Sequence, residues 1–505
     1  MKRLSIISLA TALSCSAFAA DDMNSLKAEL EQLKSQVAEL KKNQESSDVA
    51  ALATQLKELK TKTGGDNLKW DADYRVSYDM LSKTTERGEK YSNGVLSNRL
   101  WLGMKAAPRK DFSLIGQLSY DKAFGDTANH SQSNTTPGYA NFDWVTNENA
   151  TDNAVKVKTL YGIYFGEIGD VSYTASIGRR ASTNGTLANL RSDDSEASPN
   201  GHMINVEFDG ASFNFNLDKV TGVPGMAFKL CMGRGLTNAQ PRFSQNMSGT
   251  DTSYLNDKSK NTNIDMFGFI FTPYDDGQYR VTTQAFKAWN LIGFSGAGMQ
   301  AFQTAYMTYM GAQTFNNYVA LQNATPAFSN VGNMYGFTVS AIATGIGSGW
   351  SDFLDNTTAF ASWSMSKTDP GKKADGMLGS MDDKVGTSWW LGVQMPAVVT
   401  KDGKIGLEYN QGSKYWRSFT YGEDTLVGSK MAARGKAYEA YYIQPILGKT
   451  LSAELRYTHI NYDYTGSNSF FGAEGTPMTM SEATAAGQDP VKTATNGMFY
   501  LRYRY

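Results

Sequence analysis

Seven residues decide the fold of this chain: Phe499-Tyr500-Leu501-Arg502-Tyr503-Arg504-Tyr505. Side chains of a β-strand point alternately to its two faces. One face of this stretch is therefore apolar or aromatic and the other cationic: Phe499, Leu501, Tyr503 and Tyr505 against Arg502 and Arg504. Such alternation is typical of a transmembrane barrel strand, which turns its apolar face to lipid and its charged face to a water-filled lumen. The alternative is an edge strand of a soluble sheet.

The aromatic residue at position 505 also indicates how the barrel is assembled. It resembles the signal that the outer-membrane barrel assembly machinery reads on its clients. We therefore expect Phe499, Leu501, Tyr503 and Tyr505 to form an assembly signal.

The first residues of the sequence predict a secretory signal peptide, residues 1–19. Lys2 and Arg3 form a positive region, the next ten residues are mostly apolar, and Ala17-Phe18-Ala19 fits a cleavage site. Cleavage would leave Cys231 as the one cysteine, so we expect no intramolecular disulfide.

Composition narrows the class of protein further. No run of about 18 apolar residues follows the leader, so we expect no transmembrane helix. The mean hydropathy of −0.41 still permits a barrel, because only every second residue of a barrel strand faces lipid. The 48 glycines, 27 tyrosines and 25 phenylalanines against 12 prolines suit strands, tight turns and aromatic girdles. A net charge of −1 gives no reason to expect nucleic acid as a partner.

Residues 20–62 predict a periplasmic coiled coil. Apolar residues recur there at alternating spacings of three and four, the seam along which helices associate: Leu26, Leu30, Leu33, Val37 and Leu40. Such a narrow seam favours association, most simply as a homotrimer; a solvated helix packed on a barrel rim is the alternative. Residues 63–66 contain a glycine pair and predict a hinge before a barrel at 67–505.

The period changes to two from residue 67 onward, which predicts an all-β antiparallel transmembrane barrel of about 16–18 strands. Thirteen residues from Leu68 to Met80 alternate without a break, although Trp101 of the next strand is out of phase. Asp209-Gly210 predicts a hairpin turn joining strands at 204–208 and 213–217, and Asp275-Asp276-Gly277 predicts another turn.

Longer polar stretches predict extracellular loops at 123–153, 181–200, 236–260, 368–386 and 465–494. Residues 291–332 differ, because they are rich in methionine and aromatic residues and nearly uncharged. Two interpretations stay open for them: a loop folded into the lumen that narrows or plugs it, or an additional hairpin or packed helix.

The charged residues that alternate with apolar ones along the strands are candidates for the lining of a pore. The charge and width of that lining decide which ions and solutes pass. The candidates are Lys69, Asp71, Asp73, Arg75, Arg99, Lys156, Lys158, Glu408, Glu454, Arg456, Arg502 and Arg504, with Asp79, Lys105 and Glu439 beside them. Both signs occur, so the sequence favours neither cations nor anions. The alternative for each residue is a rim charge or a structural ion pair.

Catalytic and metal-binding motifs are not found. The three histidines, His130, His202 and His459, are too scattered to form a recognisable metal motif. We therefore expect no enzyme activity, no cofactor and no metal.

Several stretches together resemble a family of outer-membrane β-barrel porins of Gram-negative bacteria that is catalogued as a domain of unknown function. The stretches are Asn98–Leu100, Gly178–Arg180 with Asn184-Gly185, Gly406–Trp416, and Tyr438–Pro445 with Asp463–Ser467. The resemblance implies a location in outer-membrane lipid and a barrel, without naming a solute. We expect passive diffusion of ions and small hydrophilic solutes. The alternative is a plugged barrel that serves as an anchor, a scaffold or a sheath for a partner protein, with the coiled coil contacting the cell wall.

Overall fold

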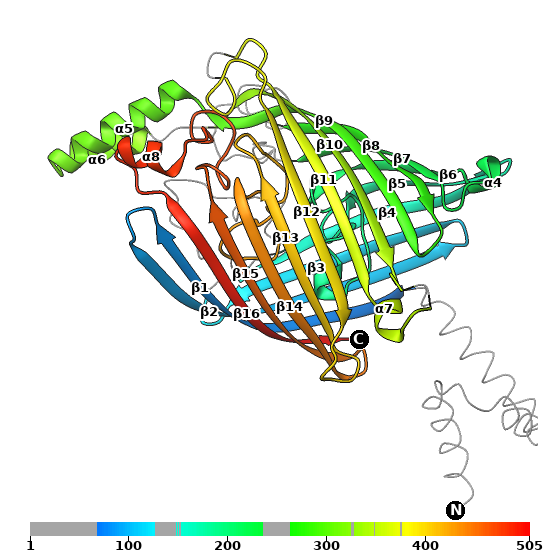
Figure 1. Cartoon of the computed structure of the whole chain (residues 1–505). Coiled ribbons are helices and arrows are strands. Elements are labelled where there is room, and N and C mark those ends of the chain that lie inside the picture. Colours follow the sequence, from blue (N-terminus) through cyan, green and yellow to red (C-terminus); the bar gives the residue numbers. More distant parts are fainter. Residues whose placement is uncertain are drawn as a thin grey trace, which may run out of the picture. The chain divides into compact units, whose positions relative to one another are not determined.

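The computed structural model describes residues 68–126, 148, 150, 153–235, 263–324, 328–347, 349–373 and 376–505. Within these residues, sixteen antiparallel strands pair in sequence order and the last pairs with the first, so the sheet is a closed barrel (Figure 1). The predicted fold class is confirmed, and the sixteen strands match the lower limit of the predicted 16–18. The predicted signal peptide, coiled coil and hinge lie outside the described residues.

The strands run from one end of the barrel to the other and back. They are β1 (Leu68–Thr85), β2 (Lys90–Arg109), β3 (Phe112–Ala123), β4 (Val155–Ile168), β5 (Val171–Arg180), β6 (Phe208–Asn216), β7 (Ala227–Gly235), β8 (Ile264–Asp275), β9 (Tyr279–Phe294), β10 (Phe328–Thr344), β11 (Thr358–Asp369), β12 (Val385–Pro396), β13 (Lys404–Gly412), β14 (Gly435–Leu447), β15 (Leu451–Tyr462) and β16 (Val491–Arg504). One end carries the connections after the even-numbered strands, most of which are short, such as residues 110–111 and 448–450.

Strands β1 and β16 close the barrel in an antiparallel register that is continuous from Asp73 to Thr84. Tyr78 lies opposite Phe499 and Arg75 opposite Arg502, so the two patterns match in phase. The exposed outer face carries Phe499, Leu501 and Tyr503, whereas Arg502 is buried inside. The alternation in residues 499–505 thus has the orientation that the sequence predicted.

Trp101 lies out of the predicted phase because it faces the interior. It is buried, and the Arg99 guanidinium lies 3.5 Å from its ring centroid while the Lys158 ammonium lies 4.7 Å from it. Stacking of cations on an indole face makes this aromatic residue compatible with a polar lumen.

The predicted hairpin around Asp209-Gly210 is wrong. Both residues lie inside β6 and pair with β7, Gly210 opposite Gly233, while residues 204–207 belong to the preceding loop. A Cβ on Gly210 would stand 2.0 Å from the Met232 carbonyl oxygen. This glycine therefore serves close strand packing, which a pattern of turn residues cannot distinguish from a turn. The turn at residues 275–277 does join β8 to β9.

The described residues of the stretch 291–332, namely 291–324 and 328–332, form no lumenal loop, so that interpretation is also wrong. They contain the end of β9, the helices α5 (Gly296–Gly311) and α6 (Phe315–Asn323), and the start of β10. Figure 1 shows both helices extending from the barrel rim. Neither helix has a buried residue, and Phe315 is 78% exposed. Three shorter helices are α4 (Asp218–Thr221), α7 (Asp352–Asp355) and α8 (Met480–Ala485). No helix among the described residues is long and apolar enough to span a membrane.

Candidate functional site

The connection between β5 and β6, residues 181–207, folds into the barrel instead of projecting from it; we call it the first inward loop. The Leu190 carbonyl accepts a hydrogen bond of 2.8 Å from Gln394 on β12. Asn200 donates one of 2.8 Å to Ser340 on β10. Since the loop starts on β5 and reaches β10 and β12, it crosses the lumen, and the prediction of an extracellular loop at 181–200 is wrong.

His202 holds the far end of this loop against the opposite wall. Its two ring nitrogens lie 2.9 Å from the hydroxyls of Ser362 on β11 and Ser388 on β12. The rings of Trp390 and Trp416 pack around it, each with its centroid 5.7 Å away. Burial in this apolar setting lowers the pKa of His202 to about 3. The imidazole is therefore neutral and acts as a structural latch.

Ion pairs fix the middle of the first inward loop. Asp193 binds Lys404 on β13 and Asp194 binds Arg502 on β16, each at 2.6 Å. Arg456 on β15 donates a 2.9 Å hydrogen bond to Ser192. Acidic and hydroxyl groups of the loop thus meet cations of three wall strands.

A second inward loop, residues 413–434 between β13 and β14, lies against the first. Phe419 forms a parallel bridge with Ile204, and its carbonyl accepts a 2.5 Å hydrogen bond from the Asn205 amide. Arg191 of the first loop donates a 3.0 Å hydrogen bond to Glu423 of the second. The two loops therefore form one bridged structure inside the barrel.

The second inward loop brings Lys430 and Asp424 to oppositely charged residues of the wall. Lys430 pairs with Glu408 at 2.7 Å and with Glu439, and all three side chains are buried. Asp424 pairs with Arg75 on β1 at 2.5 Å. Burial alone would raise the pKa of Asp424, but the Arg75 guanidinium outweighs it and holds that pKa well below the usual range.

A cavity of about 600 Å³ remains beside the first inward loop. Its lining comes from the loop and from the wall strands β16 and β1 to β4, and the polar members include Asp71, Lys105, Gln117, Asp194 and Arg504. Both signs of charge reach this space. The cavity is polar and large enough for many water molecules, at ~30 Å³ each.

The predicted pore-lining residues separate into two groups. Eight are buried, and most of these are held in ion pairs: Asp73, Arg75, Arg99, Lys158, Glu408, Glu454, Arg456 and Arg502. Four are half-buried or exposed, namely Lys69, Asp71, Lys156 and Arg504. Among all twelve, the cavity lining contains Asp71, Asp73, Lys158, Arg502 and Arg504.

Sequence reasoning missed both inward loops, and with them His202, Arg191, Glu423 and Lys430. A usable signal was present. The second loop contains Trp416, Phe419, Tyr421 and other apolar residues that a solvated loop seldom carries, together with six charged residues. Among the described residues, no group of three or more histidine, cysteine or acidic side chains could hold a metal ion.

Comparison with known proteins places residues 89–505 within a family described as "Protein of unknown function (DUF3373)". No curated protein matches the chain. Solved structures that resemble it include Salmonella typhi OmpF in complex with daunomycin, at 13% identity and a TM-score of 0.43, covering 87% of this chain and 99% of that one. An anion-selective porin from Comamonas acidovorans has 12% identity and a TM-score of 0.44, covering 87% and 100%. Pseudomonas putida OprB has 10% identity and a TM-score of 0.44, covering 88% and 96%.

Proposed function

The chain belongs to the DUF3373 family, as the resemblance in its sequence predicted, and we propose that it is an outer-membrane porin through which ions and small hydrophilic solutes diffuse passively. The observation that carries this proposal is the polar cavity of about 600 Å³ between the first inward loop and the wall. A closed barrel with a wet, charged interior gives polar solutes a route that lipid denies them.

The inward loops define where such a route runs. The second inward loop packs mainly against β11 to β15, with Asp424 reaching Arg75 on β1, whereas the cavity borders β16 and β1 to β4. Solutes would therefore pass along this open side, with the first inward loop as the other boundary of the constriction. Asp71 and Lys105, on adjacent strands, would contact the passing solutes.

The outer face supports a place in lipid. Trp70, Tyr74, Tyr78 and Leu455 are each at least 40% exposed there, as an outward apolar band requires. With this location we also propose insertion by the barrel assembly machinery through the aromatic residues of β16, and a homotrimer held by the coiled coil. Passive diffusion needs no covalent chemistry, so we propose no enzyme activity.

Conductance in planar bilayers tests the proposal. Purified protein, shown folded by heat-modifiable gel mobility, should give stepwise current, in groups of three if it is a trimer. The reversal potential under a salt gradient should give its ion preference. Folded protein that inserts silently would contradict diffusion through the barrel.

One observation favours a plugged barrel as the second candidate. The two inward loops are bonded to one another and to most of the wall, and the second is buried almost throughout. A barrel filled this way would suit an anchor or scaffold, or a sheath for a partner protein. Silent insertion, together with a co-purifying periplasmic partner or cell-wall fragment, would favour this function.

A further inference from the structure

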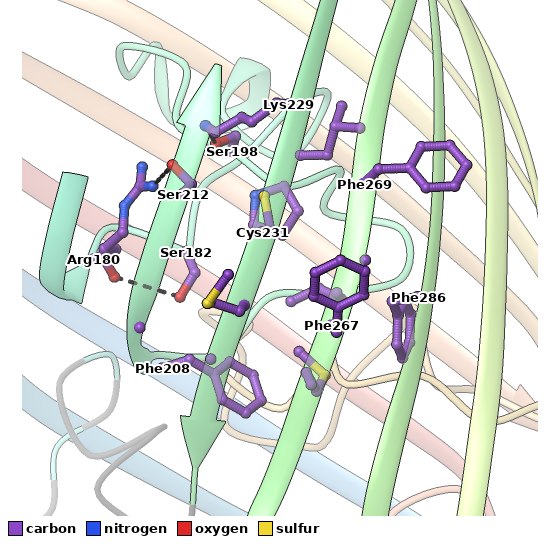
Figure 2. Close-up of a pocket in the computed structure, with 18 of the residues that line it drawn as sticks. Arg180, Ser182, Ser198, Phe208, Ser212, Lys229, Cys231, Phe267, Phe269 and Phe286 are labelled. Atoms are coloured by element: carbon purple, nitrogen blue, oxygen red, sulfur yellow. Dashed lines mark hydrogen bonds between the residues drawn. The ribbon is translucent and has the colours of Figure 1, made fainter. Parts of the chain in front are cut away.

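Hydrogen-bond donors gather where the first inward loop meets the strands β5 to β9. We call them the donor cluster: Arg180, Ser198, Ser212, Lys229 and Gln284. Figure 2 shows Arg180, Ser198, Ser212 and Lys229 close together at a cavity that Phe208 and Phe286 also line. The cluster lies outside the ion-pair network and the larger cavity described above.

The two cations of the donor cluster have no acidic partner in the part of the chain that the structure describes. Arg180 donates to the Ser212 hydroxyl, and Lys229 donates to the Ser198 hydroxyl at 2.6 Å. No described carboxylate forms an ion pair with either residue. Lys430 and Arg502, by contrast, each pair with two or more carboxylates. Two neighbouring, half-buried positive charges without a counter-ion are unfavourable, so an anion would stabilise them.

Two buried donors of the cluster also lack an acceptor. The Nε atom of Arg180 and the Nε2 atom of Gln284 have no hydrogen-bond partner among the described residues. The Gln284 side chain is only 3% exposed, and its Oε1 atom accepts a 3.0 Å hydrogen bond from the Asn200 amide, which fixes the orientation of its amide group. Buried donors are normally satisfied, so these two atoms point to a ligand that carries hydrogen-bond acceptors.

The cavity limits the size and character of that ligand. Its volume is about 90 Å³, so only a small ligand fits. Beside the donors, Phe208, Met266 and Phe286 give it an apolar part. A charged head with a short hydrocarbon tail fits both parts. We propose that the donor cluster binds a small organic carboxylate.

Binding can be measured without conduction, so failure of this proposal and failure of the porin function are distinguishable. Saturation-transfer NMR on the folded full chain in detergent would compare butyrate with butyramide, which has the same tail but no charge. We expect transfer to butyrate alone, and loss of about tenfold in affinity in Lys229→Met, because a charge-assisted hydrogen bond is removed. Lys229→Arg should retain binding, and Lys401→Met, on an exposed turn, is the matched control.

Cys231 gives a second readout, because it lines the same cavity and is a free thiol. Its sulfur displaces iodide from either iodoacetate or iodoacetamide, and iodoacetate carries the proposed head group. Butyrate should slow the labelling by iodoacetate in the wild-type chain, and butyramide should not. This labelling experiment uses the wild-type chain, so it does not depend on whether a variant folds.

Two results would overturn the proposal. One is equal saturation transfer to butyrate and butyramide, which would make the cavity a merely apolar pocket. The other is complete displacement of butyrate by chloride at the same concentration. That result would mean that the donor cluster binds any anion and that the hydrocarbon tail contributes nothing to binding.

Discussion

The two inward loops are both tied to the wall by ion pairs but fill the lumen to different extents, and the difference indicates which of them borders a pathway. The second loop, residues 413–434, brings Lys430 and Asp424 to oppositely charged residues of the wall and is buried almost throughout. The first loop, residues 181–207, brings Asp193 and Asp194 to cations of the wall and leaves a polar cavity on one side. The second loop therefore fills its side of the lumen, and the first loop borders an open part of the lumen.

The largest expected effect comes from removing Lys430, the cation of the second inward loop that pairs with the wall. In Lys430→Met, buried Glu408 would lose its cationic partner, and buried Glu439 would keep only Arg191, at 3.6 Å. Leaving buried charge uncompensated costs about 3–5 kcal/mol, so the free energy of unfolding in urea should fall by that amount. Lys449→Met, on an exposed turn, is the control. Equal midpoints for the two variants would mean that the pairs do not stabilise the barrel.

A smaller effect on stability is expected from replacing His202, the latch of the first inward loop. His202→Phe keeps the ring among the tryptophans but leaves the hydroxyls of Ser362 and Ser388 without their bonds. The loss should be roughly 1–3 kcal/mol, confined to the first inward loop. Limited proteolysis should then cut within residues 181–207 while gel mobility of the barrel is unchanged. His459→Phe, on β15, should leave the loop protected; cleavage there as well would show that the effect is general.

Acid should loosen the same latch in the wild-type chain. The folded protein keeps His202 neutral down to about pH 3, whereas in the unfolded chain this side chain takes up a proton near the ordinary histidine pKa of 6.5. Between these values the unfolded state binds more protons, so stability is complete above about pH 6.5 and falls as the pH drops, by at most about 1.4 kcal/mol per pH unit. Unfolding midpoints at pH 7 and 4.5 should differ more in wild type than in His202→Phe. An equal difference would contradict the latch.

The smallest effect concerns selectivity along the cavity. Lys105→Glu reverses an exposed charge of the lining, so the ratio of cation to anion permeability should rise, by roughly twofold. Lys436→Glu, whose side chain is exposed on β14 and does not line the cavity, is the control. A shift in reversal potential for the control alone would place the pathway elsewhere.

The sequence predicted the wall well and the interior poorly, for one physical reason. Strand residues obey an alternation of period two, which sets their face independently of distant partners, as Tyr503 and Arg502 do. Loops have no such period. The inward course of residues 181–207 depends on partners more than 130 residues away in the chain, such as Ser340 and Ser362. No local pattern encodes these contacts.

Trp101 and Gly210 show the same limit within strands. Trp101 breaks the alternation because Arg99 and Lys158 stack on it inside the barrel. Gly210 follows an aspartate, as in a turn, but serves close packing against Met232 and Gly233. In both cases the neighbour that explains the residue lies on another strand.

Accessibility of two engineered cysteines tests most directly whether one side of the lumen is open and the other filled. In a Cys231→Ser background, Gln117→Cys would lie in the cavity lining and Asn410→Cys beneath the second inward loop. A charged thiol reagent, added during single-channel recording, should reduce the conductance of the Gln117→Cys protein and leave the Asn410→Cys protein unchanged. Block at Asn410→Cys without block at Gln117→Cys would contradict the proposed pathway.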